Sequence, residues 1–342
     1  MARQALGAAL VGFGYWGPNL ARNLSASADF DLLHICDLSP GRVAAARGLY
    51  PAVDCGSDAS HAIGDDAVDA VFVATPAVVH HRLAVQAIEA GKHVLVEKPL
   101  TLDAATSDDL VARAAGRGVV LAVDHTFVYT GAVQKLRDLV NEGDLGDLRS
   151  FDSMRVNLGI VQPDVDVFWD LAVHDLSILQ YVTDRTPVSV SATGMAHAPS
   201  THASTAYMTL FYEDDFIAHV DVSWMSPVKV RRTLLAGTRR MVVYDDLEPS
   251  EKVKVYDAGV DSPETSEERH STMVSYRTGD MIAPKLDSNE ALSTEIAHLA
   301  ECIRGNSVPR ASGAMGASIV RTLEAATVSM ARRGAPVDLK AI

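Results

Sequence analysis

The first third of the chain alternates short apolar runs with segments of helical periodicity. The strand-like runs are residues 5–11, 31–36, 68–74, 94–96 and 119–123. Runs this short and this apolar are typical of strands buried on both faces. The segments between them carry helix signals, such as proline in a first turn or glycine after a last turn. Strands alternating with helices predict a doubly wound parallel sheet with right-handed crossovers.

The pattern changes after residue 124. Strand-like segments follow one another with short turns, at residues 148–158, 188–193, 205–212, 216–224, 230–236 and 241–244. Such a series predicts a largely antiparallel sheet. Helices are predicted at 132–140, 165–182, 289–304 and 314–332, and a long loop is predicted at 257–285.

The two patterns together predict an α/β protein of two domains. Residues 1–124 form a Rossmann domain with a doubly wound parallel sheet. We expect residues 125–342 to form an α+β domain with a large, mostly antiparallel open sheet. A length of 342 residues suits two domains better than one.

Charge and composition narrow the class of protein. The chain has 30 basic and 44 acidic side chains, a net charge of −14, which argues against a general binder of nucleic acid or anionic membranes. It has no apolar run of the ~18 residues that a membrane span needs and no secretory signal, so we expect a cytoplasmic protein. Cys36, Cys55 and Cys302 have no C-x-x-C spacing, so neither a disulfide framework nor a metal site is expected.

A glycine fingerprint follows the first predicted strand. In Gly12-x-Gly14-x-x-Gly17, the three glycines permit, in order, a tight turn, close approach of backbone amides to a pyrophosphate, and helix–strand packing. The helix that begins here offers oriented N–H groups to the anion. A glycine-rich turn without a ligand is the alternative. We therefore predict dinucleotide contacts for the whole loop, namely Gly12, Phe13, Gly14, Tyr15, Trp16 and Gly17.

An acidic residue lies where a Rossmann fold places its ribose ligand. Asp37 is twenty positions after Gly17, at the end of the second predicted strand. A carboxylate here accepts hydrogen bonds from the adenosine ribose and repels a 2′-phosphate, which favours NAD over NADP. Arg42 is a reservation, because a nearby arginine accommodates that phosphate. Asp37, Leu38 and Arg42 are predicted cofactor contacts.

Two further strands end in polar segments at the same edge of the sheet. Thr75-Pro76, with His80 one helical turn later, follows the strand at 68–74 and is predicted to contact the cofactor. A capping Thr-Pro with a surface histidine is the alternative.

The next strand ends in Glu97-Lys98-Pro99. Two opposite charges at the end of an apolar strand are costly to bury unless they are paired or used. A lysine at this edge can polarise an alcohol or carbonyl oxygen and share its proton. Pro99 fixes the turn, and its peptide bond is allowed to be cis. From these residues alone, a surface ion pair explains the segment equally well.

A second chemical motif is Asp170-x-x-x-His174, in the helical segment of the second domain. Residues four apart share one helix face, so the carboxylate can orient the imidazole and raise its basicity. A helix-surface pair or a core histidine is the alternative, and a zinc site lacks an evident further ligand set. Arg155 and Asn157 share one face of the strand 148–158 and are predicted to bind hydroxyl, phosphate or carboxylate groups, unless that face is solvated.

These motifs resemble the Gfo/Idh/MocA family of NAD(P)-dependent oxidoreductases, which act mostly on sugars and cyclitols. The glycine fingerprint, Thr75-Pro76 with His80, and Glu97-Lys98-Pro99 match its pattern in order and spacing, and the resemblance covers essentially the whole chain. It implies that Lys98 lies beside nicotinamide and substrate, with Glu97 on the cofactor side. It also implies that Asp170 and His174 are catalytic.

The resemblance adds two further contacts. His125 begins a connection that enters the substrate pocket in this family, and Trp169, next to Asp170, is predicted to contact the cofactor. The substrate contacts expected are then Lys98, His125, Arg155, Asn157, Asp170 and His174.

The function expected is that of an NAD-dependent sugar dehydrogenase. A ring hydroxyl of a sugar, nucleotide sugar or aminoglycoside is oxidised to a ketone, in antibiotic or aminosugar biosynthesis, as the resemblance to the nucleotide-sugar branch implies. A ketoreductase of a nucleotide-linked keto-deoxysugar, a cyclitol dehydrogenase and a catalytically silent NAD-binding regulator are the alternatives. The open sheet is expected to make a homodimer or homotetramer.

Overall fold

The computed structural model describes residues 5–159, 165–197, 201–261 and 275–342. The chain divides into two compact units. The first comprises Met1–Thr130 and Asn289–Glu324, and the second comprises Gly131–Ser288 and Ala325–Ile342. The sequence prediction drew one boundary after residue 124. In the structure the first unit continues to Thr130 and also includes helix α8 and the first part of α9, because these helices pack on it.

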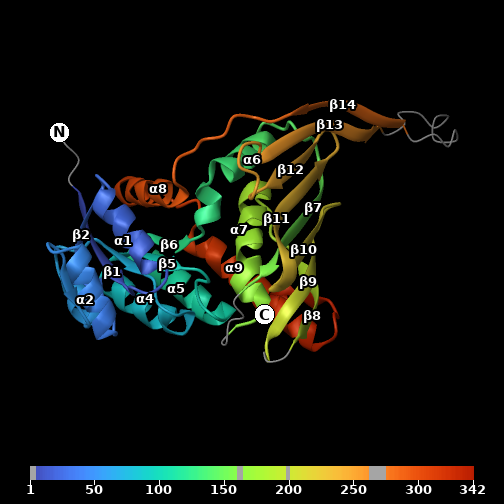
Figure 1. The fold of residues 1–342 in the computed structure, drawn as a ribbon. Coiled ribbons are helices and arrows are strands. Elements are labelled where there is room, and N and C mark those ends of the chain that lie inside the picture. The colour runs from blue at the N-terminus through green and yellow to red at the C-terminus, as the bar shows by residue number, and fades with distance from the viewer. Residues whose placement is uncertain (1–4, 160–164, 198–200, 262–274) are drawn as a thin grey trace. The chain divides into compact units, whose positions relative to one another are not determined.

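The first unit is built on a parallel sheet of six strands in the order β3-β2-β1-β4-β5-β6 (Figure 1). The strands are β1 Leu6–Val11, β2 Phe30–Cys36, β3 Asp54–Gly56, β4 Ala70–Val73, β5 His93–Glu97 and β6 Leu121–Asp124. Its helices are α1 Gly17–Ala26, α2 Pro40–Leu49, α3 Ala59–Gly64, α4 His80–Glu89, α5 Ala104–Arg117, α8 Ala291–Gly305 and the part of α9 Gly313–Ala331 up to Glu324, with short helices η1 Ala77–Val79 and η2 Thr126–Tyr129. This confirms the predicted doubly wound Rossmann sheet.

The core of this unit follows from the apolar strands. Leu10 and Phe72, on neighbouring strands β1 and β4, are fully buried, as are Leu20 and Leu24 on α1. Strand β1 lies between β2 and β4, so the strand order reverses around it. In doubly wound sheets a ligand binds at the carboxyl ends of the strands at such a reversal.

The second unit contains a sheet of nine strands in the order β14-β13-β12-β11-β7-β10-β9-β8-β15. The strands are β7 Leu148–Leu158, β8 Ser189–Ala196, β9 Ala203–Phe211, β10 Ile217–Ser223, β11 Met225–Gly237, β12 Met241–Asp245, β13 Val253–Asp261, β14 Ser275–Ile282 and β15 Val337–Asp338. Strands β7 and β10 pair in parallel, and the other pairings are antiparallel. This confirms the predicted mostly antiparallel sheet.

Helices lie along the sheet of the second unit. They are α6 Gly131–Asn141, a π-helical segment η3 Phe168–Ala172, α7 Val173–Thr183, which continues η3 without a break, and the short helix η4 Leu339–Ala341. Helix α7 packs against α6 and β7 (Figure 1). The predicted helix at 165–182 is therefore present with its first turn widened.

The long loop predicted at 257–285 is wrong for the residues described there. Strand β13 extends to Asp261, and Ser275–Ile282 forms β14, which pairs with it antiparallel (Figure 1). Strand β13 is anchored by buried Val253 and Val255. Strand β14 lies at the edge of the sheet, where backbone pairing holds the strand. Its residues 278–282 are exposed, so this part of the sequence shows no apolar pattern.

In the part of the chain that the structure describes, no helix is both long and apolar enough to cross a membrane.

Candidate active site

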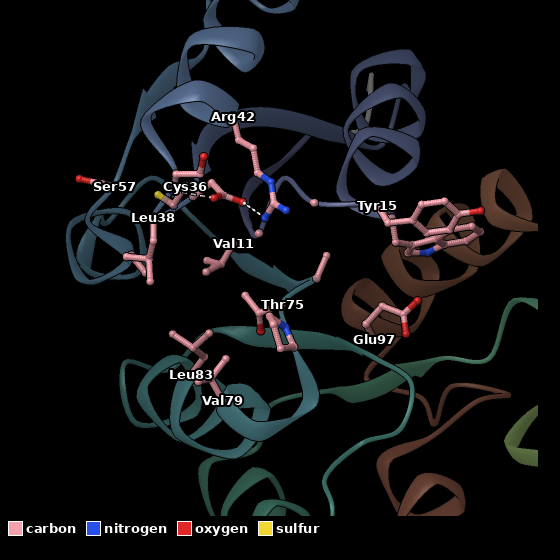
Figure 2. Close-up of a pocket in the computed structure, with 18 of the residues that line it drawn as sticks. Val11, Tyr15, Cys36, Leu38, Arg42, Ser57, Thr75, Val79, Leu83 and Glu97 are labelled. Carbon is pink, nitrogen blue, oxygen red and sulfur yellow. Dashed lines mark hydrogen bonds and ion pairs between the residues drawn. The ribbon is translucent and has the colours of Figure 1, made fainter. Parts of the chain in front are cut away.

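A cavity of about 710 Å³ lies in the first unit, at the carboxyl ends of its central strands. Its wall includes the ends of β1, β2 and β4, the glycine loop and the end of β5. Of the predicted cofactor contacts, the following line it: Gly12, Gly14, Tyr15, Trp16, Asp37, Leu38, Arg42, Thr75, Pro76 and Glu97. In Figure 2, Leu38 and Ser57 lie toward one end, Tyr15 and Glu97 toward the other, and Thr75 between them.

The glycine loop has the geometry that its sequence predicts. Gly12 has φ +104°, and a Cβ there would lie 2.2 Å from the carbonyl oxygen of Ala74. A Cβ on Gly17 would lie 2.2 Å from the carbonyl oxygen of Gly12. At Gly14 the nearest atom to such a Cβ is 3.5 Å away, on the Arg42 guanidinium. Gly12 and Gly17 are therefore required by the fold, whereas Gly14 leaves space on the cavity wall.

The glycine loop holds the Asp37 side chain in place. Its carboxylate accepts hydrogen bonds from the backbone N–H groups of Phe13 (2.7 Å) and Ser39 (2.8 Å). The Arg42 guanidinium lies 3.5 Å from the same carboxylate, as the dashed lines in Figure 2 mark. Asp37 thus couples the glycine loop to the end of β2, with Arg42 beside it on the cavity wall.

Apolar side chains form the exposed part of the wall. Tyr15 is 95% exposed, Leu38 87% and Val78 75%, although all three are large and apolar or aromatic. Exposed apolar side chains around a concave site indicate a ligand that covers them. A cavity with a glycine turn, an oriented carboxylate and apolar rims fits a dinucleotide.

Trp16 joins the glycine loop to a buried carboxyl pair. Its indole Nε1 donates to Asp124 at 2.6 Å, and Thr126 also donates to that carboxylate. Asp124 ends β6, in register with Glu97 on β5. Burial raises the pKa of Asp124, and burial followed by the Asp124 charge raises the pKa of Glu295 well above its usual value. Sequence reasoning missed this pair, because its two members come from distant segments.

Four predicted cofactor contacts of this unit do not themselves line the cavity among the described residues: Phe13, Gly17, His80 and Lys98. Phe13 contributes its backbone N–H to Asp37, while its ring packs edge-on against Tyr50. His80 is buried, with Nε2 2.8 Å from the carbonyl oxygen of Thr75 and Nδ1 2.9 Å from that of Pro99. Burial lowers the pKa of His80, and these carbonyl groups oppose that shift. His80 therefore joins the Thr-Pro turn to the Glu-Lys-Pro turn.

The Glu97-Lys98-Pro99 segment leaves β5 through a turn with a cis peptide bond between Lys98 and Pro99. Glu97 lines the cavity, and Lys98 is half-buried. His125 is fully buried, and burial together with the Lys98 charge lowers its pKa to about 3. The Lys98 charge therefore acts on the buried His125 imidazole and disfavours its protonated form.

In the second unit, Asp170 lies in the π-helical segment and His174 in the first turn of α7. Both side chains are half-buried. The indole Nε1 of Trp224 donates to Asp170 at 3.0 Å, and this indole is almost completely buried. Trp224 follows β10, and its backbone carbonyl accepts from the N–H of Gly159, two residues after Asn157. Sequence reasoning missed Trp224, which had only its size and its place at a strand end as a signal.

Arg155 is not on a solvated strand face. It is buried, and its guanidinium contacts the Asp175 carboxylate through Nε (2.7 Å) and Nη2 (3.2 Å). Ser153 donates to the same carboxylate at 2.6 Å. Asn157, a predicted substrate contact, is half-buried on the same strand. The indole of Trp169, a predicted cofactor contact, donates a hydrogen bond to Thr327 at 3.2 Å. Arg155 thus has a structural partner within its own unit, which the sequence did not reveal.

The chain is similar in sequence and in structure to known proteins. Part of the chain is 38% identical over 147 residues to UDP-N-acetylglucosamine 3-dehydrogenase of Acidithiobacillus ferrooxidans, covering 42% of this chain and 45% of that protein. It is 44% identical over 86 residues to dTDP-3,4-didehydro-2,6-dideoxy-alpha-D-glucose 3-reductase of Streptomyces violaceoruber, 25% of each. The crystal structure of GenD2 from gentamicin A biosynthesis, in complex with NAD, superposes with a TM-score of 0.81 at 24% identity, covering 99% of this chain and 97% of that one.

Two models of one family match most of the chain. Residues 6–125 match the oxidoreductase family, NAD-binding Rossmann fold, and residues 133–243 match the GFO/IDH/MocA C-terminal domain. The chain belongs to the Gfo/Idh/MocA family of oxidoreductases, and its first unit is the NAD-binding Rossmann domain of that family.

Proposed function

We propose that this protein is an NAD-dependent dehydrogenase that oxidises a ring hydroxyl of a sugar, nucleotide sugar or aminoglycoside to a ketone. The observation that supports this most directly is the place of Glu97 on the wall of the dinucleotide cavity, followed at once by half-buried Lys98. The substrate class is supported by relatives that are a dehydrogenase and a reductase of nucleotide-linked sugars. The likeness to a protein of gentamicin A biosynthesis fits a role in antibiotic or aminosugar biosynthesis.

The proposed cofactor orientation follows from the chemistry of the cavity wall. The adenosine ribose lies at Asp37, the pyrophosphate at the Gly14 backbone, and the nicotinamide toward Tyr15 and Glu97 (Figure 2). The Asp37 carboxylate repels a 2′-phosphate, and its contact with Arg42 directs that guanidinium to a carboxylate. We therefore propose NAD rather than NADP. Measuring KM for both cofactors tests this, and a clear preference for NADP would contradict it.

The proposed chemistry separates hydride and proton. NAD supplies the hydride acceptor at nicotinamide C4. The hydroxyl proton of the substrate passes to His174. The hydrogen on the carbinol carbon leaves as hydride with the electron pair of the C–H bond, and a C=O bond forms. Lys98 donates a hydrogen bond to the same oxygen and stabilises the developing alkoxide charge. Neutral His125 beside Lys98 adds no competing positive charge.

Asp170 is proposed as the residue that orients His174. The Trp224 indole holds the Asp170 carboxylate at 3.0 Å, so its direction is set by a buried and rigid group. A carboxylate one helical turn from an imidazole raises its basicity and fixes its tautomer. Asn157 remains proposed as a substrate contact. The Arg155–Asp175 pair is proposed to support strand β7 beneath these groups.

A ketoreductase of a nucleotide-linked keto-deoxysugar is the second candidate. The similarity to the dTDP-3,4-didehydro-2,6-dideoxy-alpha-D-glucose 3-reductase, 44% identical over 86 residues, favours it. A panel of nucleotide sugars, aminoglycosides and inositols discriminates the directions, monitored by NADH absorbance. Formation of NADH from NAD with a hydroxyl substrate supports the dehydrogenase, and NADH consumption confined to keto-sugars supports the reductase. NAD binding without turnover on the whole panel would favour a silent regulatory protein.

We also propose that the protein acts in the cytoplasm as a homodimer or homotetramer through its second unit. Met154, Tyr207 and Leu234 lie on one face of the nine-stranded sheet, and each is partly exposed. Phe211 and Ile217 add to the same face. Exposed apolar side chains that gather on one face of a sheet are typical of an interaction surface. Light scattering that finds only a monomer at assay concentration would contradict this part of the proposal.

A further inference from the structure

A cluster of histidine and carboxylate side chains lies at the edge of the Rossmann sheet, apart from the residues that line the dinucleotide cavity. His34 on β2 and Asp54 on β3 are partners in the parallel register, and His61 lies on α3. One ligand atom from each of these three residues lies within 4.8 Å of the other two. The structure assigns no role in the proposed reaction to any of them.

The separations of Asp54 from the two histidines suit a small tetrahedral ion. Zinc binds histidine nitrogen and carboxylate oxygen at about 2.0–2.2 Å, which places two tetrahedral ligand atoms about 3.3 Å apart. Asp54 Oδ2 is 3.4 Å from His34 Nδ1 and 3.6 Å from His61 Nε2. The larger separation is that of the exposed His61, whose side chain has freedom to adjust.

The other side of the His34 ring is built as metal-binding histidines usually are. Nε2 of His34 lies 2.7 Å from Asp65 Oδ2, while Asp65 Oδ1 accepts from the backbone N–H of Ala67 at 2.9 Å. A carboxylate that accepts from one ring nitrogen fixes the tautomer, so that the other nitrogen presents a lone pair to a metal. The His34 side chain is only 7% exposed, so its Nδ1 is held in one direction. These carboxylate and backbone contacts distinguish the cluster from a chance meeting of surface charges.

We propose that His34 Nδ1, Asp54 and His61 Nε2 bind a divalent transition-metal ion of the zinc class, with Asp65 as a positioning residue and a fourth position open to water. Two imidazoles and one carboxylate are ligands that zinc accepts. The bound ion ties the short strand β3 and helix α3 to β2. The segment between Asp54 and His61 carries Ser57 and Ala59, which line the cavity. Ser57 lies toward the end proposed for the adenosine (Figure 2). The ion therefore stabilises the corner of the domain that shapes this end.

Sequence reasoning expected no metal site, because it looked for closely spaced ligands. Here one ligand comes from each of two strands and one from a helix, and only the parallel pairing of β2 with β3 brings them together. The proposed site is independent of the dehydrogenase reaction and of its substrate.

The test uses the full-length protein without a polyhistidine tag, stripped with a chelator. Zinc binding is measured by calorimetry, and cobalt is used as a spectroscopic substitute whose visible absorption reports tetrahedral geometry. His61→Ala and Asp54→Asn remove exposed ligands without opening the core. His81→Ala is the matched control, because His81 is a half-buried histidine paired with Asp109 at 2.8 Å in the same unit.

We expect one equivalent of zinc and a tetrahedral cobalt spectrum in the wild type and in His81→Ala. His61→Ala and Asp54→Asn weaken binding by at least about tenfold, and Asp65→Asn weakens it by roughly 10–100-fold, the loss typical of an outer partner. No stoichiometric binding by the wild type, or affinity in His61→Ala within tenfold of it, would overturn the proposal. Intense ultraviolet charge-transfer absorption from a thiolate ligand would overturn it too, since it would place the ion at the neighbouring buried cysteines.

Discussion

The Trp16 indole nitrogen lies 2.6 Å from the Asp124 carboxylate, so the glycine loop is fastened to the end of β6. Trp16 lines the cavity on the glycine loop, whereas Asp124 is fully buried beside Glu295. This hydrogen bond fixes the position of the glycine loop through the rigid side chain of Trp16.

Replacing Trp16 by phenylalanine removes this hydrogen bond and keeps an aromatic ring. We expect a loss of about 1–3 kcal/mol in the free energy of unfolding, because a buried carboxyl group loses a donor. NAD affinity falls as well, since the loop is no longer fixed. Urea denaturation and calorimetry measure the two effects. Tyr15→Phe, at a highly exposed position on the same loop, is the control and should change stability by less than about 0.5 kcal/mol.

The Glu295 carboxyl group predicts an unusual dependence of stability on pH. Burial first, and the Asp124 charge second, raise its pKa in the folded state above its unfolded value of about 4.3. The folded state therefore binds this proton more tightly, and the wild type loses stability as pH rises from that value toward the folded pKa. The loss amounts to about 1.4 kcal/mol for each pH unit in this window.

Glu295→Gln keeps the shape of the neutral carboxyl group and cannot ionise. We expect its thermal midpoint to match the wild type near pH 4.5 and to exceed it at pH 8. Differential scanning calorimetry across this range gives both profiles, with the exposed Glu301→Gln on the same helix as control. Parallel profiles for wild type and Glu295→Gln would show that the raised pKa has no effect on folding.

Two glycines of the fingerprint should respond differently to alanine. A Cβ on Gly12 meets the carbonyl of Ala74 at 2.2 Å, and its φ of +104° disfavours any side chain, so Gly12→Ala should fail to fold stably. Gly14→Ala meets only the Arg42 guanidinium at 3.5 Å and should fold. Its methyl group occupies the path of the pyrophosphate, so NAD affinity should drop. Circular dichroism and NAD titration separate the outcomes; a Gly14→Ala protein with wild-type affinity would contradict this account of the cavity.

The Arg155–Asp175 ion pair should be costly to break. Asp175→Asn leaves a buried guanidinium without its counter-charge, for which we expect a loss of about 3–5 kcal/mol. Asp245→Asn is the matched control, because its partner Arg232 is largely exposed and such surface pairs contribute less than about 1 kcal/mol. Denaturant unfolding compares them. Equal losses in both variants would mean that burial of the first pair has no energetic consequence.

Local patterns were sufficient to predict most of the fold. The apolar strands of the first unit and the alternating strands of the second both predicted the observed sheets. Strand β3 has only Asp54–Gly56, too short for a pattern, and α3 follows it at once, so both were missed. Strand β14 was missed because an edge strand does not need apolar side chains. The local pattern predicted helix α8 but not the unit to which it belongs. This helix packs with the first unit, although it follows the second unit in sequence.

The candidate site was predictable where a motif carries its own chemistry. Gly12, Gly14 and Asp37 line the cavity, as their spacing predicted, and Glu97 lines it as the family resemblance implied. The partners of the site residues were not predicted, since Asp124, Glu295, Asp175 and Trp224 act through contacts between distant segments. His80 shows the limit of spacing, because its imidazole is buried between two carbonyl groups that only the folded turns bring close.

The most direct test of the central claim is turnover by variants of Lys98 and His174 on the substrate found in the panel. We predict that Lys98→Ala and His174→Ala each lower kcat by at least about 100-fold, the usual contribution of acid–base catalysis, while NAD affinity stays close to that of the wild type. Exposed Lys340→Ala and His81→Ala serve as controls and should retain full activity. Near-normal kcat in either Lys98→Ala or His174→Ala, with NAD still bound, would contradict the proposed reaction.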